Sequence, residues 1–187
     1  MNRRNALLVG AGAAAGAAGL ALAWRQQRRG DAAAASVEAL ASAPASASAS
    51  ASIWSLSFET LQGPRLAMQG LRGRPLLLNF WATWCAPCVT ELPLLDAFYR
   101  EHAPRGWQVV GLAIDQPAPV REFLARHPVR FVVALGGAGS IDLARSLGNA
   151  TGGLPFTAVF GRDGRIVDRK VGLVNADELA IWSRKAD

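Results

Sequence analysis

Cysteine and histidine are scarce in this sequence, which holds two of each among its 187 residues. Two cysteines cannot build a scaffold of several disulfide bridges. A structural zinc site needs about four ligands, and His102 and His127 lie at no ligand spacing from the cysteines. Cys85 and Cys88 are separated only by Ala86 and Pro87. Whatever these cysteines do, we expect them to do it as a pair.

Acidic residues are also few, since 14 Asp and Glu face 20 Lys and Arg, for a formal net charge of +6. A nucleic-acid-binding domain would gather such an excess in one basic patch. Here five of the basic residues precede residue 30, and the others are scattered along the chain. The part from Ile53 onward is therefore only mildly basic, and we expect no nucleic-acid partner.

The first 29 residues combine arginines with an uncharged run over residues 6–24 (ALLVGAGAAAGAAGLALAW). A run of this length can cross the hydrocarbon core of a bilayer as a helix. The start of the chain, Asn2-Arg3-Arg4-Asn5, resembles a twin-arginine export signal. Residues 1–29 are predicted to be an export signal or a membrane anchor, by the twin-arginine or the ordinary secretory route. Small residues that suit cleavage follow only at 32–35, which favours an uncleaved anchor.

Residues 30–52 are rich in Ala and Ser and have few large apolar side chains. Such a segment buries too little apolar surface to offset the entropy of ordering. We therefore predict a flexible linker over residues 30–52. Residues 53–187 have the length of one ordinary domain.

Residues 53–187 are predicted to form an α/β domain, because short apolar runs alternate with amphipathic stretches. Residues 75–81 (PLLLNFW) form a near-continuous apolar run, as in a central strand covered on both faces. Residues 53–59 and 64–68 are predicted to form a hairpin at the sheet edge. Further strands are expected at 108–114, 130–135, 156–160 and 165–171, and helices at 86–102, 119–127, 141–147 and 175–184.

Cys85 stands where the predicted strand 75–81 leads into the predicted helix 86–102. At that point its sulfur lies near free backbone N–H groups and the positive end of the helix dipole, which both favour a thiolate. Cys85 is therefore expected to be the exposed nucleophile. Cys88 follows one turn later and deeper on the same helix face. From there its thiol can attack a mixed disulfide on Cys85 and release the substrate.

Two other interpretations of the pair stay open. A purely structural disulfide would close a loop so short that it hardly constrains the unfolded chain. Inert reduced cysteines in the core are the second alternative. Pro87 argues against both cysteines being inert, because proline suits the first turn of a helix that begins beside Cys85.

Residues 79–88 (NFWATWCAPC) resemble the active-site signature of the TlpA/ResA family, membrane-anchored periplasmic thiol–disulfide oxidoreductases. The likeness runs from about Phe58 to Trp182. It implies the thioredoxin fold: a central mixed β-sheet flanked by helices on both faces, with an extra N-terminal β-hairpin. It also implies catalysis by Cys85 and Cys88, with no metal and no cofactor beyond their redox-active disulfide.

An acidic residue shortly after the second cysteine extends the resemblance. Thioredoxin proper has a buried aspartate where this sequence has Asn79, and the family instead supplies an acid in the pattern Cys-x-x-Glu-x-Pro, here residues 88–93 (CVTELP). The resemblance thus implies that Glu91 alters the pKa of Cys88 and accepts its proton. The alternative is that Glu91 is a solvated residue that only interacts with the helix dipole.

Residues 153–157 (GLPFT) resemble the family's loop that ends in a cis-proline facing the cysteines. By this resemblance Pro155 is cis, and the Leu154 backbone pairs with an extended substrate peptide. An ordinary trans proline at a strand start is the alternative. Phe156 is expected to make the groove beside the proline more apolar, and Trp84 to form a rigid contact surface beside the site.

Three further polar residues have weaker assignments. Asp115 ends a predicted strand at the carboxyl edge of the sheet, where ligands often bind. It is equally suited to begin a turn or to cap a helix. His102 and His127 are both expected at the surface, near helix ends.

The resemblance implies a disulfide reductase in the periplasm, tethered to the inner membrane, or released if the signal is cleaved. It implies protein disulfides as substrates, such as those of apocytochrome c during cytochrome c maturation, and a membrane thiol–disulfide carrier as electron donor. An oxidant, or a reductase of another substrate, stays open, because small differences in thiolate stability decide the direction of electron flow.

Two alternatives come from other classes of protein. A copper-binding metallochaperone would use the same cysteine pair, but no further His or Met ligand stands near it in the sequence. A peroxidase of the related fold would need Thr-x-x-Cys, and Ala82 occupies the threonine position.

Overall fold

The computed structural model describes residues 53–61, 63–137 and 139–186. The predicted anchor, residues 1–29, and the predicted linker, residues 30–52, lie outside the described residues. Within the described ranges, no helix is long and apolar enough to cross a membrane.

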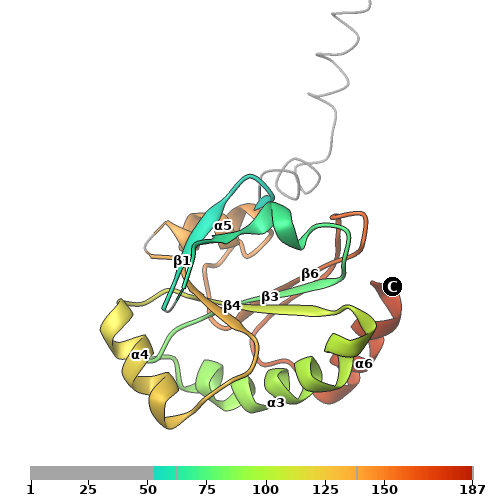
Figure 1. Cartoon of the computed structure of the whole chain (residues 1–187). Helices are drawn as coiled ribbons and strands as arrows, with labels where there is room; N and C mark the ends of the chain where they lie inside the picture. Colours follow the sequence, from blue (N-terminus) through green and yellow to red (C-terminus); the bar gives the residue numbers. More distant parts are fainter. Residues whose placement is uncertain (1–52, 62, 138, 187) are drawn as a thin grey trace, which may run out of the picture. The chain divides into compact units, whose positions relative to one another are not determined.

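The strands of the described residues form one mixed sheet in the order β2-β1-β5-β4-β3-β6-β7 (Figure 1). At its centre, β3 pairs in parallel with β4 and antiparallel with β6. β5 runs parallel to β4, whereas β1 and β7 run antiparallel to their neighbours. The strands are β1 (Ser57–Thr60), β2 (Leu66–Ala67), β3 (Leu76–Trp81), β4 (Gln108–Ala113), β5 (Val132–Leu135), β6 (Phe156–Phe160) and β7 (Ile166–Val171).

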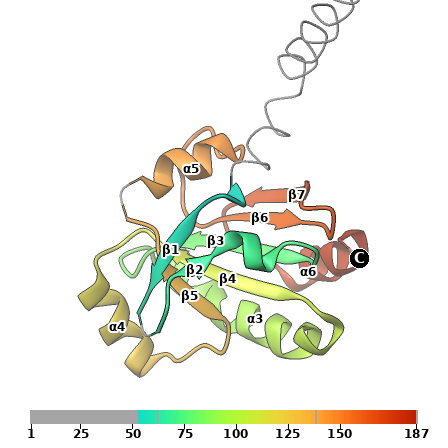
Figure 2. The same ribbon diagram turned by 45° about the horizontal axis from the view of Figure 1, so that its top comes forward.

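Helices cover both faces of this sheet. Figures 1 and 2 show α3, α4 and α6 on one face and α5 on the other. This three-layer arrangement is the thioredoxin fold, as predicted. The helices are α3 (Ala86–His102), α4 (Pro117–Arg126), α5 (Ser140–Ser146) and α6 (Ala176–Lys185), with 3-10 turns η1 (Met68–Leu71) and η2 (Ala103–Arg105).

All six residues of β3 are buried, as the apolar run predicted. Successive side chains of a strand point to opposite faces of the sheet. Accordingly Leu77 and Trp81 pack in the core beneath α3, α4 and α6, while Leu78 and Phe80 pack in the core beneath α5. Asn79 shares the α3 face with Leu77 and Trp81, and it is the one polar side chain of this central strand.

The predicted strand over residues 53–59 is wrong for its first four residues. Ile53 to Leu56 form a helical turn, closed by a 3.1 Å bond from the Leu56 N–H to the Ile53 carbonyl, and β1 begins only at Ser57. Ile53 and Trp54 are consecutive, yet both are buried in the same core cluster. An extended strand would send them to opposite faces, so burial of both requires the turn.

Trp54 fastens the start of the domain to the turn between β6 and β7. Its indole N–H donates to the Gly164 carbonyl at 3.0 Å, and its ring lies edge-on to Phe160 with centroids 5.3 Å apart. The second predicted strand, residues 64–68, shortens to β2, because the fully buried Met68 already begins the η1 turn. β2 pairs with β1 at the edge of the sheet.

His102 was expected at the surface and is instead buried. Its ring stacks on Phe98 with centroids 4.2 Å apart, and its Nδ1 lies 3.1 Å from the Phe98 carbonyl oxygen. The cause is helical spacing, because residue 102 follows the buried Phe98 by four positions on the same face of α3. His127, beyond the end of α4, is exposed as expected.

Candidate active site

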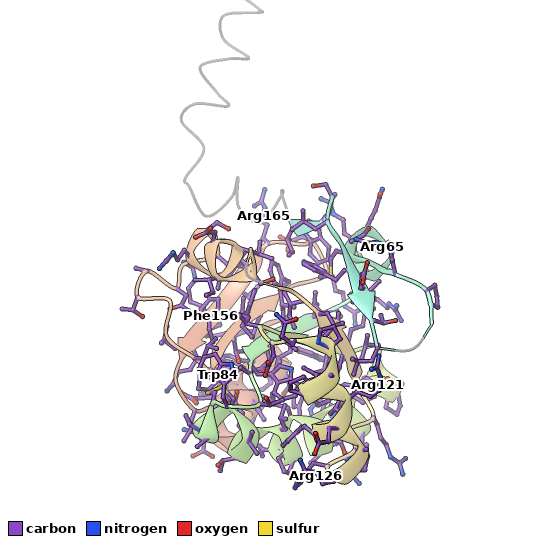
Figure 3. All side chains as sticks on the ribbon, turned by 90° about the vertical axis from the view of Figure 1, so that its left-hand side faces the viewer. Arg65, Trp84, Arg121, Arg126, Phe156 and Arg165 are labelled. Atoms are coloured by element: carbon purple, nitrogen blue, oxygen red, sulfur yellow. A yellow bond between two sulfur atoms is a disulfide. The ribbon has the colours of Figure 1, made fainter. Side chains whose placement is uncertain are left out.

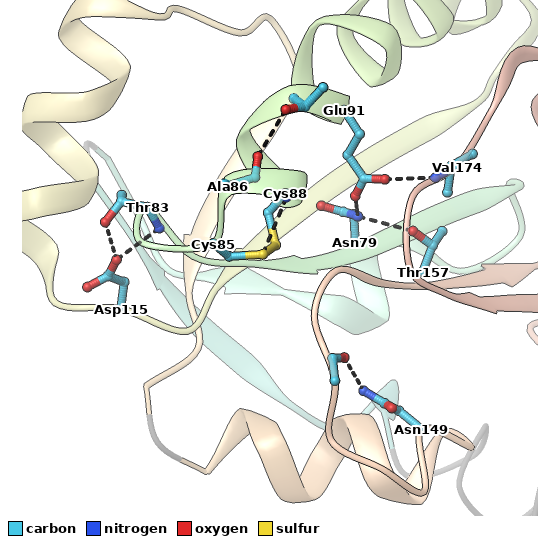
Figure 4. The surroundings of a disulfide bond; sticks show 12 residues. Asn79, Thr83, Cys85, Ala86, Cys88, Glu91, Asp115, Asn149, Thr157 and Val174 are labelled. Carbon is cyan, nitrogen blue, oxygen red and sulfur yellow. Dashed lines mark hydrogen bonds between the residues drawn. A yellow bond between two sulfur atoms is a disulfide. The ribbon is translucent and has the colours of Figure 1, made fainter.

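The two cysteines lie where β3 leads into α3, and they form a disulfide (Figure 4). Cys85 is the N-cap residue of α3, with extended backbone, and its sulfur accepts a hydrogen bond from the Cys88 N–H at 3.3 Å. The S–S distance is 2.04 Å. The sulfur of Cys85 thus occupies the position at which a helix N-terminus stabilises a thiolate.

The two cysteine residues differ in access to solvent. Cys88 is fully buried, while Cys85 keeps 6% of its surface exposed. Cys85 is more exposed than Cys88, as predicted, although in the disulfide form it is less exposed than the sequence suggested. Beside it, Trp84 is 69% exposed. A partner that reaches Cys85 therefore meets the Trp84 ring.

Glu91 lies on α3, one turn beyond Cys88, and only 2% of its surface is exposed. Its Oε1 accepts a hydrogen bond from Asn79 Nδ2 at 2.7 Å, and its Oε2 accepts one from the Val174 backbone N–H at 3.0 Å. This burial excludes the interpretation of Glu91 as a solvated residue. The carboxyl group is held inside the domain on the Cys88 side of the disulfide, as Figure 4 shows.

Burial raises the pKa of the Glu91 carboxyl above its ordinary value, although hydrogen bonds from Val174 and Asn79 act in the opposite direction. A carboxyl group with a raised pKa takes up and releases protons nearer to neutral pH than an ordinary glutamate. Such a group suits proton exchange with a thiol one helical turn away.

Asn79 connects Glu91 to the strand that follows the proline loop. Its Nδ2 donates to Thr157 Oγ1 at 3.0 Å as well as to Glu91, and both Asn79 and Thr157 are fully buried. Sequence reasoning assigned no role to Thr157 or to the Val174 backbone. The available signal was a Thr within a strand, Phe156–Phe160, whose other members are all apolar.

Asp115 lies on the other side of the disulfide, just beyond the carboxyl end of β4 (Figure 4). Its Oδ2 accepts hydrogen bonds from both the backbone N–H and the hydroxyl of Thr83. Burial raises the pKa of Asp115, but hydrogen bonds from Thr83 and Gln116 outweigh it, and the net pKa is lowered. Asp115 therefore anchors the segment that carries Trp84 and Cys85, and it does not cap α4, whose N-cap residue is Gln116.

The Leu154–Pro155 peptide bond is cis, as predicted. The loop before it is shaped by Asn149, whose side-chain N–H donates to the Gly153 carbonyl at 2.8 Å. The Pro155 carbonyl in turn accepts a 2.8 Å hydrogen bond from the Gly172 N–H, which joins this loop to the end of β7.

Phe156 does not line a groove beside the proline. Its side chain is fully buried and packs against Phe80, with ring centroids 5.5 Å apart, in the core beneath α5. As the first residue of β6 it points to the face opposite Thr157. The expectation of a more apolar groove at Phe156 is therefore wrong.

Within the described residues, no group of three His, Cys, Asp or Glu side chains is placed to hold a metal ion. The functional elements brought together are a cysteine pair at a helix start, a buried carboxyl group behind it and a cis-proline loop. On the thioredoxin fold, these elements define a thiol–disulfide oxidoreductase.

Comparison with known proteins supports this class. The family model described as Redoxin matches residues 42–180, and the chain belongs to that family. Within it the chain is a TlpA/ResA-like protein. It is 28% identical over 126 residues to the thiol-disulfide oxidoreductase ResA of Bacillus cereus, with 67% of this chain and 70% of that protein covered.

Solved structures agree with the sequence comparison. The structure of MTB DsbF in mixed oxidized and reduced forms is 27% identical, with a TM-score of 0.63, and the match covers 77% of this chain and 98% of that chain. A putative thiol:disulfide interchange protein DsbE from Chlorobium tepidum is 26% identical, with a TM-score of 0.60 and coverage of 67% and 86%.

Proposed function

We propose that this oxidoreductase is a reductase of protein disulfides, with Cys85 as the nucleophile and Cys88 as the resolving thiol. The observation that carries the proposal is the buried Glu91, one helical turn from Cys88. When ionised, its carboxylate opposes a thiolate nearby. A strong oxidant is one whose reduced form is stabilised, so a group that opposes the thiolate favours a reductase.

The loops around the disulfide also supply no cation that would stabilise a thiolate. Residues 82–87, 114–119, 148–155 and 171–176 contain a single charged residue, Asp115. Figure 3 labels four arginines, which belong to the β1–β2 hairpin, to α4 and to the turn between β6 and β7. Apart from the helix dipole, no positive group within these loops favours the reduced form; the guanidinium groups of Arg169 and Arg145, from β7 and α5, lie beside Gly148 and Gly152.

The same loops suit an unfolded polypeptide as substrate. Three of the six exposed large hydrophobic residues of the described domain, Trp84, Val171 and Leu173, belong to them. Figure 3 shows Trp84 at the surface, beside the start of α3. A surface that is largely apolar and has a single charged residue attracts exposed chain rather than a charged folded partner. Among such substrates, we propose apocytochrome c with its haem-site cysteines oxidised.

The proposed place of action is the periplasm. Support comes from the sequence, in which arginines and the uncharged run at 6–24 precede the Ala/Ser-rich segment 30–52. With residues 1–29 as anchor and 30–52 as linker, the domain is tethered to the inner membrane, and a membrane thiol–disulfide carrier returns it to the dithiol form.

The proposal is tested by letting the reduced chain react with a peptide that carries the two haem-site cysteines of an apocytochrome c as a disulfide. We expect the chain to reduce the peptide, and Leu173→Lys to slow the reaction about tenfold, because an apolar contact of 1–2 kcal/mol is lost. Ile181→Lys is the matched control, since Ile181 is 42% exposed against 47% for Leu173 but lies on α6.

Two results would argue against this assignment. Failure to reduce the peptide would remove apocytochrome c as substrate, and equal slowing by both lysine substitutions would remove the apolar surface as its docking site.

Because the loops around the disulfide contain only one charged residue, Asp115, we also expect the rate constant to change less than about twofold as salt is raised, in contrast to reactions steered by charge.

A further inference from the structure

The side-chain oxygen of the buried Asn79 has no hydrogen-bond partner. Its Oδ1 is one of four buried side-chain N or O atoms of the described residues that have no hydrogen-bond partner. A buried carbonyl oxygen without a donor is costly and uncommon. Both hydrogens of the same amide are used, by Glu91 Oε1 at 2.7 Å and by Thr157 Oγ1 at 3.0 Å. The ionised Glu91 carboxylate can only accept, so it fixes the orientation of the amide. Turned over, the oxygen could accept from the Thr157 hydroxyl, but it would face the Glu91 carboxylate and Nδ2 would lose both acceptors.

The unpartnered oxygen faces the disulfide. Asn79 lies on the α3 face of β3, between Leu77 and Trp81, which belong to the same core cluster as both cysteines. Figure 4 shows the oxygen on the side of Asn79 that points toward Cys88, away from Thr157. In the disulfide form neither sulfur carries a hydrogen, so neither can donate to this oxygen.

We propose that the Asn79 carboxamide oxygen accepts a hydrogen bond from the Cys88 thiol once the disulfide is reduced. A dithiol donor breaks the Cys85–Cys88 bond, supplies two electrons and leaves as a disulfide. Of the two protons that the donor loses, one goes to the Cys88 sulfur and the other to the Cys85 sulfur, or to solvent where Cys85 stays a thiolate. The Cys88 S–H bond so formed points to Asn79 Oδ1. This contact belongs to the reduced form, whichever way electrons flow in the cell.

In the reduced form the Asn79 amide would therefore hydrogen-bond to both the Cys88 thiol and the Glu91 carboxyl group. Its oxygen orients the Cys88 thiol, and its N–H orients Glu91, the group placed to accept the Cys88 proton when that thiol attacks a mixed disulfide. A carboxylate at this position would add a second buried negative charge beside Glu91. The neutral amide provides an acceptor for the Cys88 thiol without adding that charge. In the disulfide form the amide oxygen has no hydrogen-bond partner.

The test uses infrared spectroscopy on the full chain with Cys85 alkylated by iodoacetamide. The sequence has only two cysteines, so Cys88 is then the source of the single S–H stretching band. We expect this band at lower wavenumber than in the urea-unfolded chain, because the donor bond weakens in a hydrogen bond. Asn79→Leu should return it toward the unfolded value, and Thr157→Val, which leaves the oxygen in place, should not.

A second readout is the equilibrium with glutathione. Losing the hydrogen bond in the reduced form should shift the Asn79→Leu equilibrium about two- to tenfold toward the disulfide, with a change of less than twofold for Thr157→Val. A wild-type band at the unfolded position would overturn the proposal, even if Asn79→Leu fails to fold. A band that stays shifted in folded Asn79→Leu would assign the acceptor to another group.

Discussion

Replacing Cys88 by serine will trap substrate proteins on Cys85 as mixed disulfides, and replacing Cys85 by serine will abolish turnover. Cys85 sits at the helix start with 6% of its surface exposed, whereas Cys88 is fully buried. Cys85 is therefore the cysteine that exchanges with a substrate disulfide, and only Cys88 is placed to resolve the mixed disulfide that forms. Loss of a covalent nucleophile should reduce turnover by at least about a thousandfold.

The trapping experiment is read on a non-reducing gel after mixing with oxidised apocytochrome c. Ala86→Ser is the matched control, because it adds a hydroxyl between the cysteines and removes no sulfur; it should turn over and trap nothing. If the Cys85→Ser protein accumulates mixed disulfide on Cys88 and the Cys88→Ser protein accumulates none on Cys85, the roles of the two cysteines are reversed.

Replacing Glu91 will affect both stability and the rate of resolution. Glu91→Leu leaves Asn79 Nδ2 without one acceptor and the buried Val174 N–H without its carboxylate. Such losses cost about 1–3 kcal/mol of unfolding free energy. Resolution by Cys88 should also slow by about a hundredfold, the lower end of the range for loss of a general base. Denaturant unfolding and stopped-flow release of a thiol product measure the two effects.

The pH dependence of stability has a definite sign at this residue. Burial raises the folded-state pKa of Glu91 above its unfolded value, so the native state binds the proton more tightly. The contribution of Glu91 to the free energy of unfolding is fully present below its ordinary pKa. It is lost as the pH rises through the raised pKa of the folded state. In Glu91→Gln this loss should vanish, and the free energy of unfolding should fall less with rising pH.

Glu178 provides a control of opposite sign. Its hydrogen bond with Lys170 lowers its pKa, so its contribution is present at neutral pH and is lost as the solution is acidified. Glu178→Gln should therefore reduce the loss of stability in acid. Because the Glu178 charge also contributes to the raised pKa of Glu91, this substitution should weaken the loss of stability at higher pH without abolishing it. A Glu91→Gln protein with the same pH slope as wild type would show that burial does not perturb this carboxyl group.

Local features of the site could be predicted from the sequence. The position of Cys85 followed from an apolar strand run that meets a helix with Pro87 in its first turn, and the cis state of Pro155 followed from the resemblance of residues 153–157 to a loop of the family. Each depends on a few consecutive residues, so each leaves a signal in the local sequence.

Contacts between distant segments could not be predicted in this way. Thr157 and the Val174 N–H reach Asn79 and Glu91 across 78 and 83 residues of chain. No spacing or periodicity encodes that meeting, which depends on β6 pairing with β3 and on the loop that precedes α6. The turn at Ile53 was missed for a similar reason, because Trp54 is placed by Gly164, 110 residues away.

The most direct test of the reductase assignment is the reduction potential of the Cys85–Cys88 couple in the full chain, equilibrated against graded ratios of reduced and oxidised dithiothreitol or glutathione. The buried Glu91 and the absence of cations in the surrounding loops predict a value near or below that of thioredoxin, roughly −270 mV. A value near about −120 mV, typical of a strong oxidant, would contradict the assignment and indicate a protein that forms disulfides.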